Sequence, residues 1–303
     1  MDYEAGGLHL ATPGAISRQK KNTGDFDVAV RINRHGLRDD KDVSQATGDD
    51  IIVIGNSFAW GWGVESARRF SDLVQARTGT RVFNVTTPGD LETDFRLLQY
   101  ARELGAHPPR LVIVALGMEN DIRLYNTGRG RPEALAPESP TGWGWLADQR
   151  RALSRWLAER SAAYVLAVTA IHRTPWLQAL AVQAGFIVPN LDGMSKNVYS
   201  PEKIDASVRK LQEIAQGQKM LVVLIASRGL WVGPNAAVED LVHRSLASAL
   251  DDRGFDVLDL RALFEAGGAP LQYHFANDGH WKERGHAVAA QAIAARLAGK
   301  NDR

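Results

Sequence analysis

Five short apolar runs, each followed by a helical pattern, constrain the fold of this chain more than any other feature. The runs lie at 51–54, 81–85, 111–116, 220–226 and 255–260. Three of them are almost continuous in Val, Ile and Leu, which is typical of strands covered on both faces of a parallel sheet. Repeated strand and helix units joined by right-handed crossovers predict an α/β fold with a central, mainly parallel five-stranded sheet.

The segments between these runs show ordinary helix signals. Helices are predicted at 70–78, around 94–104, from 201 onward, at 238–250 and at about 283–297. Ser200 and Pro201 indicate an N-cap followed by proline at the first helical position. Arg253-Gly254 indicates a C-terminal stop. Each predicted strand is therefore followed by a helix that can cover one face of the sheet.

Two segments lie outside this repeating pattern. We expect residues 1–48 to form an N-terminal extension that packs on the core, with an edge strand where the apolar residues alternate from Phe26 to Ile32. Residues 49–303 form the main domain in this prediction, interrupted by a helical insertion at about 126–200. A long helix over 148–171 and a break near Pro175 are expected inside the insertion. It is either a lid that selects the substrate or, alternatively, a surface elaboration or a dimer contact.

Charge and composition exclude several classes of function. The 36 basic and 35 acidic residues form no long run of either sign, so neither nucleic acid nor an anionic membrane surface is an expected partner. The chain has no cysteine, which excludes disulfides, thiolate metal sites and a cysteine nucleophile. The apolar stretch 162–171 is too short to cross a bilayer core of about 30 Å, so no transmembrane segment is predicted. A small, neutral or weakly charged substrate fits better.

The amino-terminal sequence, MDYEAGGLHLATPG, lacks the basic-then-apolar order of a signal peptide. Either the protein is cytoplasmic, or Met1 replaces a leader or an anchor and the protein is extracytoplasmic. The compartment and the oligomeric state stay open.

Ser57 directly follows the first central strand, in the stretch IIVIGNSFAWGWGVE at 51–65. Ligands of open parallel sheets bind beyond the carboxyl ends of the strands, so this serine is a candidate nucleophile. Its hydroxyl would lie at the start of a helical element, where backbone N–H groups favour negative charge. The alternative is that Ser57 is a helix cap or a turn residue.

Two further residues follow neighbouring strands and could complete an oxyanion hole with the N–H group of Ser57. Gly89 lies in FNVTTPGD after the second strand, where a missing side chain lets a backbone N–H approach a ligand. Asn120 lies in LGMEND after the third strand, and its amide can donate to the same oxygen. Taken singly, each is equally at home as a turn or cap residue.

A serine nucleophile requires a base, and the segment LQYHFANDGHWKERGH after the fifth strand provides one. His280 is the predicted base, and Asp278 is predicted to accept its other ring N–H. His274 is the reserve candidate, whereas a packing or capping role is expected for His286. A zinc site built from His274, Asp278 and His280 is the minor alternative, because this spacing matches no established metal motif.

Taken in order along the chain, these polar blocks resemble the successive motifs of the SGNH (GDSL-type) hydrolase superfamily. The blocks are Gly-Asn-Ser-Phe at 55–58, Gly89, Gly117 with Asn120-Asp121, and Asp278-Gly-His280-Trp. The four eponymous residues would be Ser57, Gly89, Asn120 and His280, and the resemblance covers roughly residues 28–298. It implies a flavodoxin-like three-layer α/β/α sandwich, ester or acyl-group chemistry, and neither a metal nor another cofactor.

The sequence departs from the family pattern at two points. Asn56 stands where the common motif has Asp, and the acid and base are spaced as Asp-x-His instead of Asp-x-x-His. A similar Asp-x-His-Trp block occurs in members that acetylate bacterial exopolysaccharides, so hydrolase and acyltransferase both stay open. The Gly-x-Ser-x-Gly pattern of the α/β-hydrolases is absent at Ser57, which argues against that fold.

The sequence thus predicts a serine-dependent esterase or deacylase that acts on a small acyl ester, with an O-acetylated carbohydrate as a candidate, through an acyl-serine intermediate. The alternatives are an O-acyltransferase that modifies a polysaccharide and a non-catalytic ligand-binding module on the same fold. Trp60 and Trp62 follow the nucleophile and would either form an apolar or sugar-stacking wall or pack the loop on the N-terminal extension.

Overall fold

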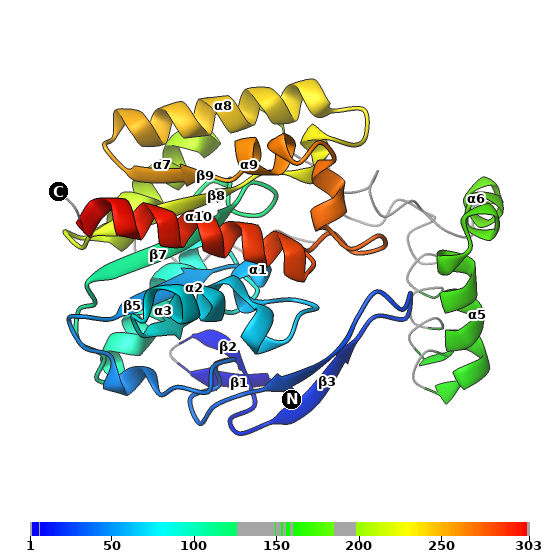
Figure 1. The fold of residues 1–303 in the computed structure, drawn as a ribbon, viewed down its shortest axis with the longest axis horizontal. Coiled ribbons are helices and arrows are strands. Elements are labelled where there is room, and N and C mark those ends of the chain that lie inside the picture. Colours follow the sequence, from blue (N-terminus) through cyan, green and yellow to red (C-terminus); the bar gives the residue numbers. More distant parts are fainter. Residues whose placement is uncertain are drawn as a thin grey trace.

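The computed structural model describes residues 2–5, 7–125, 160–184 and 198–301, together with residues 149, 153, 156 and 157. Its centre is a five-stranded sheet with the strand order β6-β5-β7-β8-β9, in which every neighbouring pair is parallel (Figure 1). The strands are β5 (Ile51–Gly55), β6 (Val82–Asn84), β7 (Leu111–Gly117), β8 (Met220–Ile225) and β9 (Asp256–Asp259). The five predicted strands and their parallel arrangement are confirmed.

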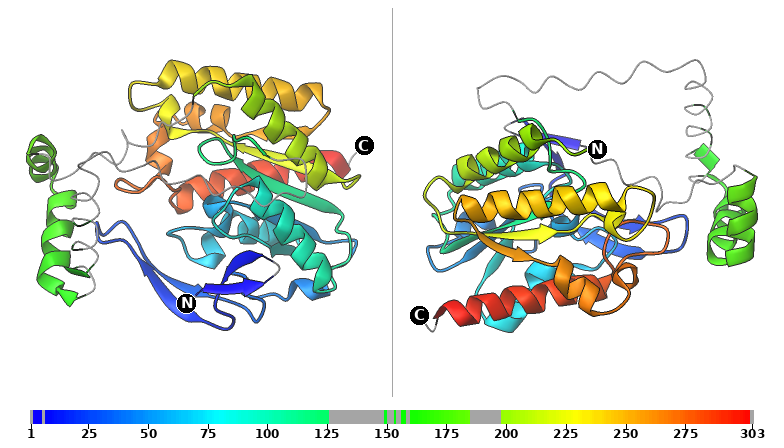
Figure 2. Two further views of the ribbon diagram at one scale, coloured as in Figure 1. Left: turned by 180° about the vertical axis from the view of Figure 1, so that it is seen from behind. Right: turned by 90° about the horizontal axis from the view of Figure 1, so that it is seen from above.

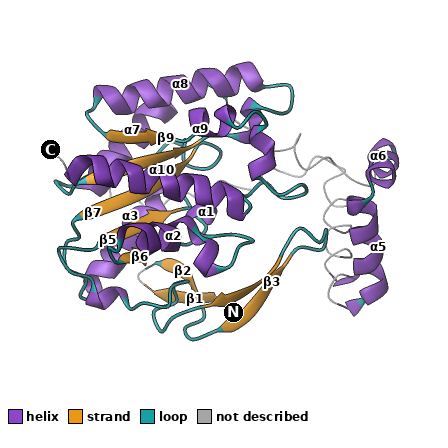
Figure 3. Cartoon of the chain, in the orientation of Figure 1, coloured by secondary structure: helices purple, strands orange, loops and turns teal. Residues whose placement is uncertain are grey.

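Helices cover both faces of this sheet, which gives three layers (Figure 3). One face packs against α3 (Leu91–Glu103), α7 (Pro201–Ala215) and α8 (Ala236–Asp252). The other face packs against α2 (Phe70–Thr78) and α10 (Glu283–Asn301), with the short α9 (Arg261–Ala266) beside them. Along β5, Ile52 and Ile54 enter the first core, whereas Ile51 and Val53 enter the second. A strand buried on both faces requires a continuous apolar run, which is why the sequence identified it.

The N-terminal segment forms two antiparallel hairpins outside the central sheet. β1 (Asp2–Ala5) pairs with β2 (Leu8–Ala11), and β3 (Ile16–Lys20) pairs with β4 (Asp27–Arg31). The predicted strand near residues 26–32 is therefore real, but its partner is β3 and not the central sheet. Phe26 and Val28, which are buried in this segment, pack on Val64 and Phe275. Val64 lies in the loop after Ser57, and Phe275 lies in the segment before His280.

Two helices of the predicted insertion are described. α5 (Ala162–Arg173) and α6 (Pro175–Gln183) meet at Thr174, so the chain breaks where Pro175 predicted it. Figure 2 shows the pair standing beside the main body, next to the tip of the β3–β4 hairpin. Most of the predicted helix before residue 160 lies outside the described residues, and the division of the chain at residue 48 stays a prediction. Among the described helices, none is both long and apolar enough to span a membrane.

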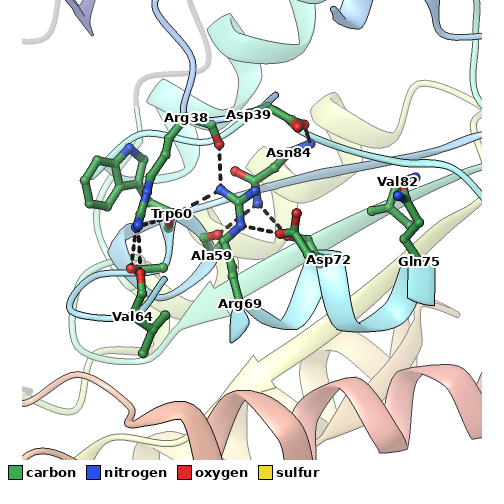
Figure 4. Close-up of polar contacts among 12 residues, drawn as sticks. Arg38, Asp39, Ala59, Trp60, Val64, Arg69, Asp72, Gln75, Val82 and Asn84 are labelled. Atoms are coloured by element: carbon green, nitrogen blue, oxygen red, sulfur yellow. Dashed lines mark hydrogen bonds and ion pairs between the residues drawn. The ribbon is translucent and has the colours of Figure 1, made fainter. Parts of the chain in front are cut away.

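Arg38 ties the N-terminal segment to the loop that follows Ser57 (Figure 4). Its buried guanidinium donates to the backbone carbonyls of Gly61 at 2.6 Å and Val64 at 2.7 Å, and to those of Trp60 and Ala29 at 3.2 Å. Burial lowers the pKa of Arg38 to about 10, so the group stays charged at neutral pH. One cation therefore donates to four carbonyls from two segments of the chain. The carbonyls of Gly61 and Trp60 also accept from the N–H of Val64 at 3.2 Å and from Arg69 Nη1 at 3.5 Å.

Two buried carboxyl groups, Asp94 at the start of α3 and Asp121 after β7, lie beneath the loop that carries Ser57. Burial raises the pKa of Asp121 to about 7, against the effect of hydrogen bonds from Gly117 and Asn56. Burial, and then the charge of Asp121, raises the pKa of Asp94 well above its ordinary value. Two carboxylates this close cannot both ionise without a cost to stability.

Replacement of Arg38 by methionine should lower the free energy of unfolding by about 2 to 5 kcal/mol, because four carbonyls lose the hydrogen bonds that they accept from a buried charged group. Urea unfolding of the purified variant measures this loss. Arg31→Met is the matched control, because Arg31 is exposed on the same segment; it should change stability by less than about 0.5 kcal/mol. Equal effects of the two substitutions would contradict the assigned role of Arg38.

Asp94→Asn should raise the melting temperature more at pH 8 than at pH 4.5. The raised folded-state pKa means that the wild-type carboxyl lowers stability progressively as the pH rises above its unfolded value near 3.8, and the amide removes this loss. Thermal unfolding at the two pH values measures the difference. The exposed Asp49, changed to Asn as a control, should show no such trend. A gain that is the same at both pH values would argue against a buried ionisation.

Candidate active site

The end of β5 places Ser57 at the carboxyl edge of the sheet. Gly55 has a φ of 144°, and a Cβ there would lie 2.8 Å from the Cβ of Ala115, so only glycine fits this sharp exit. Asn56 then caps the one-turn helix α1 (Ser57–Trp60), because its side-chain oxygen accepts the N–H of Phe58 at 3.0 Å. Ser57 is the first residue of that turn and is 8% exposed.

Asn56 also joins this loop to the one after β7. Its side-chain nitrogen donates to Oδ2 of Asp121 at 3.1 Å, and the same oxygen accepts the N–H of Gly117 at 2.6 Å. The Asn that departs from the common motif therefore donates to Asp121, whereas an Asp at position 56 would place a third carboxyl group beside those of Asp94 and Asp121. This provides a physical reason for the departure at position 56.

Ser57, His280 and Asp278 form a continuous chain of hydrogen bonds. Ser57 Oγ lies 2.7 Å from His280 Nε2, although 223 residues separate them. His280 Nδ1 lies 2.5 Å from Asp278 Oδ1, which also accepts the backbone N–H of His280 at 3.0 Å. With the ring proton on Nδ1 donated to Asp278, Nε2 is left as the acceptor for the serine hydroxyl.

The second oxygen of Asp278 is bound by a residue that the sequence did not indicate. Lys21, at the turn between β3 and β4, donates from Nζ to Asp278 Oδ2 at 2.8 Å. Burial acts to raise the pKa of Asp278, but hydrogen bonds from His280 and Lys21 outweigh it and hold this pKa well below its ordinary value. The carboxylate is therefore ionised at any pH at which the protein is expected to work.

Aromatic rings enclose the imidazole of His280. Trp62 stacks on it with ring centroids 5.3 Å apart and an interplanar angle of 25°, and Phe58 lies at 5.0 Å. The guanidinium of Arg38 instead lies over the ring of Trp60, with Cζ 4.5 Å from the ring centroid. Both tryptophans therefore contact the N-terminal segment, Trp60 through Arg38 and Trp62 through the cluster that contains Phe26 and Val28, and Trp62 also lies against the predicted base.

The two predicted oxyanion-hole residues lie on either side of Ser57 in the order of the sheet. Gly89 follows β6 and Asn120 follows β7, and these two strands flank β5. A Cβ on Gly89 would lie 2.6 Å from Oγ1 of Thr93, so the position has no room for a side chain. The side chain of Asn120 is exposed, which leaves its amide accessible to a ligand.

The other two histidines of the C-terminal segment lie in buried, largely aromatic surroundings. His286 stacks on Phe70 at 6.1 Å, and His274 lies between Trp231 and Phe264 at 6.0 Å from each. Burial lowers the pKa of each of these histidines to about 3. Within the described parts of the chain, no group of three His, Cys, Asp or Glu side chains could hold a metal ion.

An ion pair between Arg228 and Glu119 lies against the loop of Asp278 and His280, and the sequence did not indicate it. Arg228, just after β8, forms a bidentate pair with Glu119. Its Nε donates to Oε1 at 3.1 Å, and its Nη2 donates to Oε2 at 2.9 Å. A Cβ on Gly279 would lie 1.6 Å from Nη1 of this guanidinium. The pair therefore connects the residue before Asn120 to the glycine between Asp278 and His280, and a side chain at position 279 would displace it.

Comparison with known proteins adds the family. The model of the GDSL-like Lipase/Acylhydrolase family matches residues 53–288. No curated protein matches the chain significantly.

Several solved structures are similar at low identity. A lipolytic G-D-S-L family protein from Veillonella parvula is 15% identical, with 81% of this chain and 96% of that one covered and a TM-score of 0.44. A lipase/acylhydrolase from Enterococcus faecalis is 13% identical, with 83% and 96% covered and a TM-score of 0.46. The C-terminal catalytic domain of a Streptococcus pneumoniae peptidoglycan O-acetyltransferase is 13% identical, with 84% and 96% covered and a TM-score of 0.38.

The family match spans most of the chain and includes every residue of the Ser57, His280 and Asp278 hydrogen-bond chain. The protein belongs to the GDSL-like lipase/acylhydrolase family and is an ester hydrolase of the SGNH type.

Proposed function

We propose that this protein is a serine-dependent esterase that cleaves a small acyl ester through an acyl-serine intermediate. The observation that carries the proposal is the hydrogen bond of 2.7 Å between Ser57 Oγ and His280 Nε2, with His280 Nδ1 held by Asp278. A hydroxyl with an imidazole acceptor and a carboxylate behind it is the arrangement that activates a serine nucleophile. A protein that only binds a ligand does not require a hydroxyl, an imidazole and a carboxylate in this sequence of hydrogen bonds.

In the first half-reaction, Ser57 Oγ attacks the acyl carbonyl carbon while His280 Nε2 takes the hydroxyl proton. The oxyanion that forms accepts hydrogen bonds from the N–H groups of Ser57 and Gly89 and from the Asn120 amide. Collapse of this intermediate breaks the bond to the alcohol oxygen, and His280 returns the proton to that leaving oxygen. Asp278 stays ionised and stabilises the imidazolium throughout.

In the second half-reaction, water attacks the acyl-serine carbonyl and gives its proton to His280. The carboxylic acid leaves and Ser57 regains its proton. An O-acetylated carbohydrate is the substrate class we favour, because Trp62 remains partly exposed beside His280 and an indole face can pack against a sugar ring.

An O-acyltransferase is the second candidate. The spacing Asp278-Gly279-His280-Trp281 resembles that of SGNH members that acetylate exopolysaccharides. In that reaction a sugar hydroxyl replaces water as the acceptor in the second half-reaction, and the same residues serve both outcomes.

Ser57→Ala should reduce the hydrolysis of p-nitrophenyl acetate by a factor of about 10³ or more, because the nucleophile is lost and only the binding and oxyanion groups remain. Release of p-nitrophenol measures the rate, and circular dichroism checks the fold. Ser66→Ala, farther along the same loop, is the matched control and should keep full activity. Undiminished turnover by Ser57→Ala would refute the proposed nucleophile.

The choice between hydrolysis and transfer is decided with an acetyl donor in the presence and absence of an oligosaccharide acceptor. We expect acetate to be released at the same rate in both mixtures, since water is the proposed acceptor. Mass spectrometry of the oligosaccharide and an acetate assay measure the two products. Acetylated oligosaccharide formed at the expense of acetate, and absent with Ser57→Ala, would replace the esterase by the transferase.

A further inference from the structure

Lys21 lies outside the part of the chain that the family model matches, yet it contacts the proposed catalytic acid. The match begins at residue 53, whereas Lys21 belongs to the β3–β4 hairpin of the N-terminal segment. Its ammonium group lies 2.8 Å from Asp278 Oδ2 across 257 residues of sequence. The N-terminal segment therefore adds a cation to a site whose other residues come from the family domain.

The two oxygens of Asp278 have separate partners. Oδ1 accepts both the ring N–H and the backbone N–H of His280, and Oδ2 accepts the ammonium of Lys21. Asp278 is only 6% exposed, whereas the Lys21 side chain is 32% exposed. A buried carboxylate held at both oxygens cannot rotate about its terminal bond without losing a hydrogen bond to a charged group.

The turn that carries Lys21 is itself fixed. The backbone N–H of Lys21 donates to Phe26 O at 3.0 Å, and its carbonyl accepts the N–H of Gly24 at 2.9 Å. From the opposite side, Thr169 and Arg173 of α5 donate to the carbonyls of Asn22 at 2.7 Å and Gly24 at 3.0 Å. Figures 1 and 2 show this hairpin tip lying next to α5.

The loop of the catalytic acid is held by the same two elements. The backbone N–H of Asn277 donates to Asp25 of the hairpin at 3.3 Å, and its side-chain oxygen contacts His172 of α5 and Gln178 of α6, each at 3.1 Å. The hairpin tip, the α5–α6 pair and the loop before Asp278 thus form one junction. Lys21 is the member of this junction that reaches the carboxylate.

We propose that Lys21 is a positioning residue that holds the Asp278 carboxylate in line with His280 and offsets part of its negative charge. The inference rests on the proposed function of Ser57, His280 and Asp278. Without Lys21, Asp278 stays next to His280 through the two hydrogen bonds of Oδ1, but it is aligned less firmly with the ring, and its uncompensated charge stabilises the imidazolium more strongly. Both effects reduce the supply of correctly oriented, neutral imidazole near neutral pH.

Other ionisable groups face this pair from neighbouring elements and stay unchanged in the test. They are Asp25 on the hairpin, His172 on α5, Arg228 after β8, and His274, Lys282 and His286 around the base. Because these groups are the same in every variant, a difference between variants at position 21 reports on the Lys21 ammonium.

The test compares Lys21→Met with Lys21→Arg and with Lys20→Met. Lys20 is the neighbouring lysine and pairs with the exposed Asp27 at 3.4 Å, so it controls for loss of a positive charge on the same hairpin. We expect Lys21→Met to lower kcat about 10- to 100-fold, the scale of a lost hydrogen bond between charged groups, with KM unchanged. The acidic limb of its pH–rate profile should move to higher pH by about 0.5 to 1 unit. Lys21→Arg should restore most of both, and Lys20→Met should resemble the wild type.

A measurement without turnover separates this inference from the function on which it rests. The titration of the His280 imidazole, followed by NMR in the wild type and the same variants, should have its midpoint at higher pH in Lys21→Met only. Lys21→Gln replaces the methionine variant if that variant does not fold. If the wild type hydrolyses no ester but the midpoint moves, the proposed function fails and the role of Lys21 stands. An unchanged midpoint, or an unchanged kcat in an active enzyme, overturns the role of Lys21.

Discussion

The hydrogen bond between Ser57 and His280 depends on one constraint, which is that the loops at the carboxyl ends of parallel strands meet at one edge of the sheet. The chain leaves β5 at Gly55, which has a backbone conformation that only glycine adopts readily, and reaches Ser57 two residues later. His280 lies in the segment between β9 and α10. The strand order places β5 between β6 and β7, so the loops with Gly89 and Asn120 flank the serine. The residues that carry the proposed chemistry therefore lie together at the carboxyl edge of the buried sheet.

Charged side chains hold the loops of the site in place. Arg38 satisfies carbonyls of the loop after Ser57, Arg228 grips Glu119 beneath Gly279, and Lys21 binds Asp278. Each joins segments that are far apart in sequence, and each is charged while it does so. Hydrogen bonds to charged groups are stronger than hydrogen bonds between neutral groups. The buried pair Asp94 and Asp121 has the opposite effect, because ionisation there opposes the fold.

The sequence predicted the parts of the structure that follow local or periodic rules. Three of the five central strands were identified because burial on both faces requires nearly continuous apolar runs, and α7 begins where Ser200 and Pro201 predicted it. Ser57 and His280 were predicted from strand-end position, residue chemistry and an ordered set of family motifs; the structure places them in contact, and their catalytic roles stay a proposal. Lys21 could not be found in this way, because its pairing with Asp278 spans 257 residues and no local pattern marks one lysine in a turn. Arg228 and Glu119 escaped for the same reason, and the short strands β1 and β3 carry too little apolar alternation to be recognised.

The central claim is that Ser57 is an activated nucleophile facing a set of donors at the edge of the sheet. The most direct measurement is a crystal structure of the protein after reaction with a small fluorophosphonate. The account predicts a covalent bond from phosphorus to Ser57 Oγ, with the phosphonyl oxygen within about 3 Å of the Gly89 nitrogen and the Asn120 side-chain nitrogen. An unmodified Ser57, or an adduct whose phosphonyl oxygen faces away from both donors, would contradict it.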